Sequence, residues 1–117
     1  MPILSDGAVD ASLATARAFF SKYFPAFADA EYVCESWILS PALSEIMPET
    51  SRVRRFSERF SVAFWEEDSP AFRDWIFPSA VTAPAEKLPE ETSLQRAVKR
   101  HLLAGGKVGW AEGVLKA

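Results

Sequence analysis

The sequence contains little of three residue types that often build catalytic and metal sites. Its 117 residues include one cysteine, one histidine and five glycines. A single cysteine forms no internal disulfide, so nothing in the sequence indicates an oxidising compartment. One histidine and one cysteine cannot supply a tetrahedral metal site, and no glycine-rich nucleotide loop is present. We therefore expect no metal cofactor.

Positive charge and long apolar runs are also scarce. The formal net charge is −3, which argues against a nucleic-acid partner. No stretch approaches the roughly 20 apolar residues that span a bilayer, so we expect no membrane partner. The first residues, Met-Pro-Ile-Leu-Ser-Asp-Gly, lack the basic and apolar segments of a signal peptide. A cytoplasmic location is the expectation.

Aromatic residues, by contrast, are abundant. They make up 13% of the chain and include nine Phe and four Trp. Residues 1–117 are about the length of one domain, and we expect a single one. The rings either fill its core or face a partner or a ligand.

The first half of the chain has the patterns of helix, strand, helix and helix. A helix is predicted after Ser5 and Asp6, either of which can cap it, and Pro25 ends it. Its apolar face is Val9, Leu13, Ala16, Phe20 and Tyr23. Residues 31–38 favour a strand with Glu35 and Trp37 on one face. Ser40-Pro41 starts a short helix that Pro48 stops, and Thr50 or Ser51 starts another.

The second half is predicted as strand, strand, helix and strand. Alternation over residues 60–65 indicates a strand, and 71–77 read as its hairpin partner. Thr92 and Gln95 fit the capping box of a long helix that ends at the Gly105-Gly106 pair. Residues 107–115 make a final strand whose two glycines mark a bulge or a close backbone approach. The predicted order is α-β-α-α-β-β-α-β, an α+β fold.

Cys34 has two interpretations. A catalytic thiol needs a base or a positive field that lowers its pKa. The sequence shows no signature of a cysteine enzyme, and free cysteines are among the most buried residues. We interpret Cys34 as a packing residue.

Two residues are candidates for acid–base catalysis. His101 lies on the apolar face of the last long helix and could act as a general base; the alternative is a histidine bonded to a carbonyl. Glu35 beside Trp37 could also act as a base, since burial would raise its pKa; the alternative is an exposed glutamate.

Two groups of basic residues could bind phosphates. Arg52, Arg55 and Arg59 step by three and four, so they form one helical stripe, and guanidinium groups suit phosphates. A solvated helix face explains the same stripe. A second group near a helix C-terminus matches the helix dipole without a ligand. It consists of Lys99, Arg100 and Lys107.

Several stretches together resemble the C-terminal half of a bacterial acyltransferase-like family of the GNAT superfamily. They are RAFFSKYFP (17–25), CESWILSPAL (34–43), SRVRRFSERF (51–60) and TSLQRAVKRHLLAGGK (92–107). The resemblance implies a GNAT-like fold, with a mixed, mainly antiparallel sheet and helices on both faces. Family members are about twice as long, with a separate N-terminal half. The superfamily's pyrophosphate loop, Gln/Arg-x-x-Gly-x-Gly/Ala, does not occur here, and Arg52 stands where the family has Asn.

The resemblance also implies an activity, the transfer of an acyl group from acetyl-CoA or another acyl-CoA to an amine. Under this hypothesis Arg52, Arg55 and Arg59 are the candidate CoA ligands, His101 and Glu35 are the candidate catalytic residues, and an N-terminal half completes the enzyme. The alternative is a non-catalytic GNAT-like module that associates with itself or another protein through exposed aromatic residues.

Overall fold

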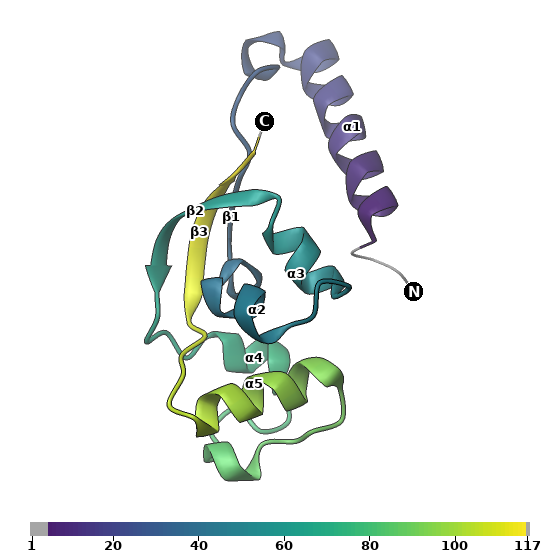
Figure 1. Ribbon diagram of the computed structural model, residues 1–117. Coiled ribbons are helices and arrows are strands. Elements are labelled where there is room, and N and C mark those ends of the chain that lie inside the picture. The colour runs from purple at the N-terminus through teal and green to yellow at the C-terminus, as the bar shows by residue number, and fades with distance from the viewer. Residues whose placement is uncertain (1–4, 117) are drawn as a thin grey trace.

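The computed structural model describes residues 5–116 (Figure 1). Helices separate the three strands along the chain, and short 3₁₀ helices (η) join some of the elements. The elements are α1 Asp6–Tyr23, η1 Pro25–Phe27, β1 Val33–Ser36, η2 Trp37–Leu39, α2 Pro41–Ile46, α3 Arg52–Ser57, β2 Phe60–Glu66, α4 Phe72–Ile76, η3 Ala85–Lys87, α5 Ser93–Leu103 and β3 Trp110–Leu115.

The three strands form one antiparallel sheet in the order β1-β3-β2, so the last strand of the chain lies in the middle. The α+β class and the antiparallel sheet are confirmed. Two glycines of the final segment bring backbones close together, as predicted. A Cβ on Gly113 would lie 2.8 Å from the Ser61 carbonyl oxygen, and Gly109 has a φ of 68°. The bulge itself lies opposite, in β2, between Val62 and Phe64.

The predicted strand over 71–77 is wrong, because this segment forms helix α4. Phe72 and Ile76 are both buried, and they lie four residues apart on one helical face. Trp75, on the other side, is 66% exposed. The apolar residues of this segment fit both the two-residue period of a strand and the 3.6-residue period of a helix. Packing against α5 and Leu88 in the core selects the helix. β2 therefore pairs with β3 instead of with its sequence neighbour.

The predicted strand over 31–38 is also too long. β1 ends at Ser36, whose hydroxyl accepts a hydrogen bond from the Ile38 amide and so caps η2. Trp37 belongs to η2, so the prediction that Glu35 and Trp37 share a strand face is wrong.

The core lies where the short helices meet the C-terminal part of the chain. Its buried residues are Leu43, Met47, Phe72, Ile76, Phe77, Leu88, Val98 and Val108. Side-chain caps position the helices around it as the sequence predicts. Ser40 caps α2 and also donates to the Val108 carbonyl, and Thr92 caps α5 through the Gln95 amide.

Helix α1 stands apart from this body (Figure 1). Of its predicted apolar face, only Val9 is buried, and Tyr23 is exposed. The described chain measures 51 × 29 × 24 Å with a radius of gyration of 16.0 Å; a compact chain of this length has about 13 Å. Large rings at the far end of α1 and in η1 are about half exposed. They are Phe19, Tyr23, Phe24 and Phe27.

Candidate functional site

One face of the sheet carries three carboxylates beside two aromatic rings. Glu35 of β1 lies opposite Glu112 of β3, and Glu112 lies opposite Phe64 of β2. Glu66 and Trp110 form the next pair. Glu35, Glu66 and Glu112 are exposed, and a hollow of about 100 Å³ lies between these five residues. The face is therefore negative and accessible.

Glu35 and Glu112 are close neighbours for a geometric reason. The Leu115 amide donates a hydrogen bond to the Tyr32 carbonyl over 2.8 Å. Because hydrogen-bonded and non-hydrogen-bonded pairs alternate along the ladder, Cys34 and Gly113 form a hydrogen-bonded pair, and Glu35 and Glu112 form a non-hydrogen-bonded pair. Side chains of such non-hydrogen-bonded pairs approach most closely. Like charges directly opposite each other are unfavourable, so this position favours a positively charged group.

Cys34 faces the other side of β1 and is half-buried. Burial raises the pKa of its thiol, and the neighbouring Glu35 carboxylate raises that pKa further. An activated cysteine needs the opposite environment. The packing interpretation holds, although the side chain is less buried than a core residue.

The prediction of one helical arginine stripe is only partly right, because α3 ends at Ser57 and Arg59 lies in the turn before β2. Arg55 and Arg59 contact the start of α1. Arg55 lies 3.2 Å from Asp6, and Arg59 lies 3.2 Å from Asp6 and 2.7 Å from Asp10. The hydrogen bond that Arg59 donates to Asp10 raises the pKa of Arg59, and its contact with Asp6 adds to this effect. Arg52 is exposed and forms no ion pair with residues 5–116. The spacing of Asp6 and Asp10, one helical turn apart, was the available signal for this contact.

His101 lies at the end of α5, away from the carboxylate face. Its Nε2 is 3.0 Å from the Lys107 carbonyl oxygen, and its ring covers Gly106. This contact agrees with the alternative interpretation, a histidine bonded to a carbonyl. His101 does not line the hollow beside Glu35. In the second basic group, Lys99 pairs with Glu90 over 3.3 Å and Lys107 pairs with Asp68.

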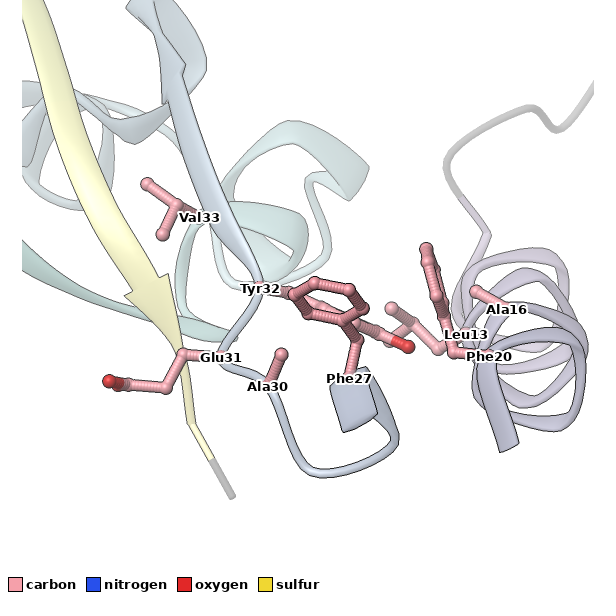
Figure 2. A pocket seen from close by; sticks show the side chains of 8 residues that line it. All are labelled: Leu13, Ala16, Phe20, Phe27, Ala30, Glu31, Tyr32 and Val33. Atoms are coloured by element: carbon pink, nitrogen blue, oxygen red, sulfur yellow. The ribbon is translucent and has the colours of Figure 1, made fainter. Parts of the chain in front are cut away.

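A larger, mostly apolar hollow separates α1 from the start of β1. Its volume is about 450 Å³, and its lining includes Leu13, Phe20, Phe27, Tyr32 and Val33. Figure 2 shows the Tyr32 ring pointing toward α1, whereas Glu31 and Val33 point away from it. No sequence pattern indicated this hollow, because it depends on how α1 stands relative to β1.

Residues 5–116 contain no cluster of three or more His, Cys, Asp or Glu that could hold a metal ion. Within the same part of the chain, no helix combines the length and apolar character that crossing a membrane requires.

Solved acyltransferase structures share this fold. One is an acyltransferase in complex with decanoyl-CoA and teicoplanin, and another is an acyltransferase with CoA and 10C-teicoplanin. Each superposes with a TM-score of 0.79 at 28% identity, over 97% of this chain and 36% of the other. A third, with decanoyl-CoA, gives 0.77 over 94% of this chain and 35% of the other, also at 28% identity. The chain thus spans about a third of their length.

A comparison with curated proteins found no match. The model of one sequence family, however, matches residues 2–115, which is nearly the whole chain. The motifs quoted from the sequence and the observed α+β fold agree with that match. The chain belongs to the GNAT-like C-terminal domain family.

Proposed function

We propose that this chain is the C-terminal domain of an acyl-CoA-dependent acyltransferase that acts on an amine. The observation that carries the proposal is the likeness, over 97% of the chain, to acyltransferases solved with decanoyl-CoA. Those enzymes are about three times as long, so the proposal includes a further N-terminal part that completes the site.

The carboxylate face is our candidate acceptor site. An amine is protonated at neutral pH, and the opposed carboxylates of Glu35 and Glu112 favour a cation between them. For transfer, the amine must lose a proton, and its nitrogen then attacks the thioester carbonyl. The C–N bond forms, the C–S bond breaks and CoA leaves as the thiol after taking up a proton. We assign Glu35 the role of the base that accepts the amine proton.

For the CoA phosphates we retain Arg52, Arg55 and Arg59 as candidates. Arg52 is exposed and forms no ion pair within residues 5–116. Arg55 and Arg59 already contact Asp6 and Asp10, so a phosphate would have to replace these carboxylates. His101 remains a weaker candidate for catalysis, because its Nε2 already contacts a carbonyl oxygen.

The test is a thermal-shift titration with acetyl-CoA, decanoyl-CoA and free CoA. A ligand at about 100 times its dissociation constant stabilises the folded state by about 2.7 kcal/mol. Arg52→Gln should weaken the shift, whereas Arg96→Gln, on the distant helix α5, should not. Absence of any shift, both for this chain and for a version extended to the length of the solved enzymes, would contradict the proposal.

A second function is favoured by the exposed rings of α1 and η1. Phe19, Tyr23, Phe24 and Phe27 are each about half exposed, and Phe27 also lines the apolar hollow. Such a surface suits a non-catalytic module that associates with itself or another protein. Analytical ultracentrifugation tests self-association: a monomer at high concentration that binds no apolar dye would contradict this function.

A further inference from the structure

The outer edge of β1 is available for strand pairing. Within residues 5–116, β1 pairs only with β3, and the sheet order leaves its other side open. The Tyr32 carbonyl accepts a hydrogen bond from the Leu115 amide. Since the direction of the backbone N–H and C=O groups alternates from residue to residue along a strand, those of Tyr32 and Cys34 point toward β3. The N–H and C=O groups of Val33 and Glu35 therefore point outward.

The side chains along this edge have two different characters. Val33 and Glu35 of β1, and Glu31 just before the strand, occupy alternate positions, and all three are exposed. Tyr32 points the other way, toward α1 and into the 450 Å³ hollow between the two elements (Figure 2). Its hydroxyl is buried and has no hydrogen-bond partner among the described residues.

A second copy of the chain fits this edge poorly. In the antiparallel register that pairs all three exposed residues, Val33 faces its own copy and Glu31 faces the Glu35 of the other molecule. Carboxylates directly opposite each other destabilise a strand pair. The charges instead match a strand that carries Lys or Arg at these positions.

We propose that the outer edge of β1 binds an extended strand of a partner polypeptide. An apolar residue of that strand lies opposite Val33, and a Lys or Arg lies two positions away on each side, opposite Glu31 and Glu35. The residues between them are apolar and enter the hollow beside Tyr32. Main-chain hydrogen bonds supply the binding, and the alternate side chains supply the specificity. This proposal is independent of acyl transfer.

The first test uses labelled peptides with the 117-residue chain. One peptide has the core Lys-Leu-Val-Leu-Lys between threonines, and its control has Glu in place of both Lys. Fluorescence anisotropy should show saturable binding of the lysine peptide and about tenfold weaker binding of the glutamate peptide. The double variant Glu31→Lys/Glu35→Lys should reverse this preference. Equal binding of both peptides to the unaltered chain, or no binding of either, would overturn the proposal.

The second test removes one outward donor. Val33→Pro deletes an N–H that points away from β3, so the β1–β3 ladder is preserved, and it should weaken the lysine peptide about threefold to tenfold. Val62→Pro on β2, at the opposite edge of the sheet, is the matched control. The Lys116 amide donates to the Arg59 carbonyl, so by the same alternation the N–H of Val62 points away from β3. Equal effects of the two substitutions would contradict the assignment to β1. If the chain forms a dimer without peptide and Val33→Pro dissociates it, a second copy occupies the edge and the proposed partner is wrong. Should Val33→Pro fail to fold, the charge-reversal variant still tests the proposal, because it contains no proline.

Discussion

Arg59 donates a hydrogen bond to Asp10 over 2.7 Å, and this contact ties α1 to the rest of the molecule. Arg59 and Arg55 both reach Asp6 as well, so two arginines and two aspartates form a small network. Helix α1 has 18 residues but only one of them, Val9, is buried. Its position therefore depends on charge to an unusual degree for a helix of this length.

We expect Arg59→Gln to loosen α1 without unfolding the body. Exposed ion pairs each contribute about 0.2–1 kcal/mol, so losing the two that Arg59 makes should cost about 1 kcal/mol locally. Amide hydrogen exchange over residues 6–23 should then become about fivefold faster, and high salt should produce the same change in the unaltered chain. Asp29→Asn is the control, because Asp29 forms no ion pair with the described residues. If exchange in α1 is unaffected by both Arg59→Gln and salt, packing rather than charge holds the helix.

The chemistry of Cys34 gives a second prediction. Burial, and then Glu35, raise the pKa of its thiol, so the thiolate is scarce at neutral pH. Alkylation by iodoacetamide should be slower than for a free cysteine at pH 8, and its rate should keep rising above the ordinary thiol pKa. Glu35→Gln removes the smaller cause and should moderately accelerate labelling, whereas Glu45→Gln, on α2, should not. Faster labelling than a free cysteine at pH 7 would contradict the packing interpretation.

The sequence predicted best those features that depend on a few neighbouring residues. The caps at Ser40 and Thr92 and the glycine at the end of α5 follow from local hydrogen bonding and backbone freedom, and the structure has all three. Strand β2 was also predicted closely, at 60–65 against Phe60–Glu66. Each of these signals lies within a few residues of the element it defines.

The errors arose where distant contacts decide. Residues 72–76 became a helix because Phe72 and Ile76 pack in the core, which a strand-like alternation could not reveal. The candidate site shows the same limit. Glu35 was identified from its strand, but its partner Glu112 depends on the pairing of β1 with a strand almost 80 positions away. The contact of Arg59 with Asp10 likewise depends on the placement of α1.

Two glycines should respond in opposite directions to replacement by alanine. Gly109 has a φ of 68°, and a Cβ there would lie 2.7 Å from the Cα of Glu67 and also meet the Glu66 carbonyl. Gly109→Ala should therefore lower the free energy of unfolding by about 2–4 kcal/mol. Gly7 lies in α1 with open space around it, so Gly7→Ala should be neutral or stabilise the helix by up to about 1 kcal/mol. Urea denaturation of both variants measures the difference, and a Gly109→Ala chain as stable as the original would contradict the observed turn.

His101 and Gly106 provide the last prediction, because the histidine ring occupies the space that a Cβ on Gly106 would need. Gly106→Ala must displace the ring and break the contact between His101 Nε2 and the Lys107 carbonyl, at a cost of about 1 kcal/mol. In a His101→Ala background the same substitution should cost little, since the ring is gone. A double-mutant cycle, measured by urea denaturation, gives the coupling free energy between the two substitutions. Gly105→Ala is not a suitable control, because Gly105 has a φ of 85° and alanine would be strained there. Additive effects of the two substitutions would show that the ring is not held against Gly106, and would leave His101 free to turn toward a substrate.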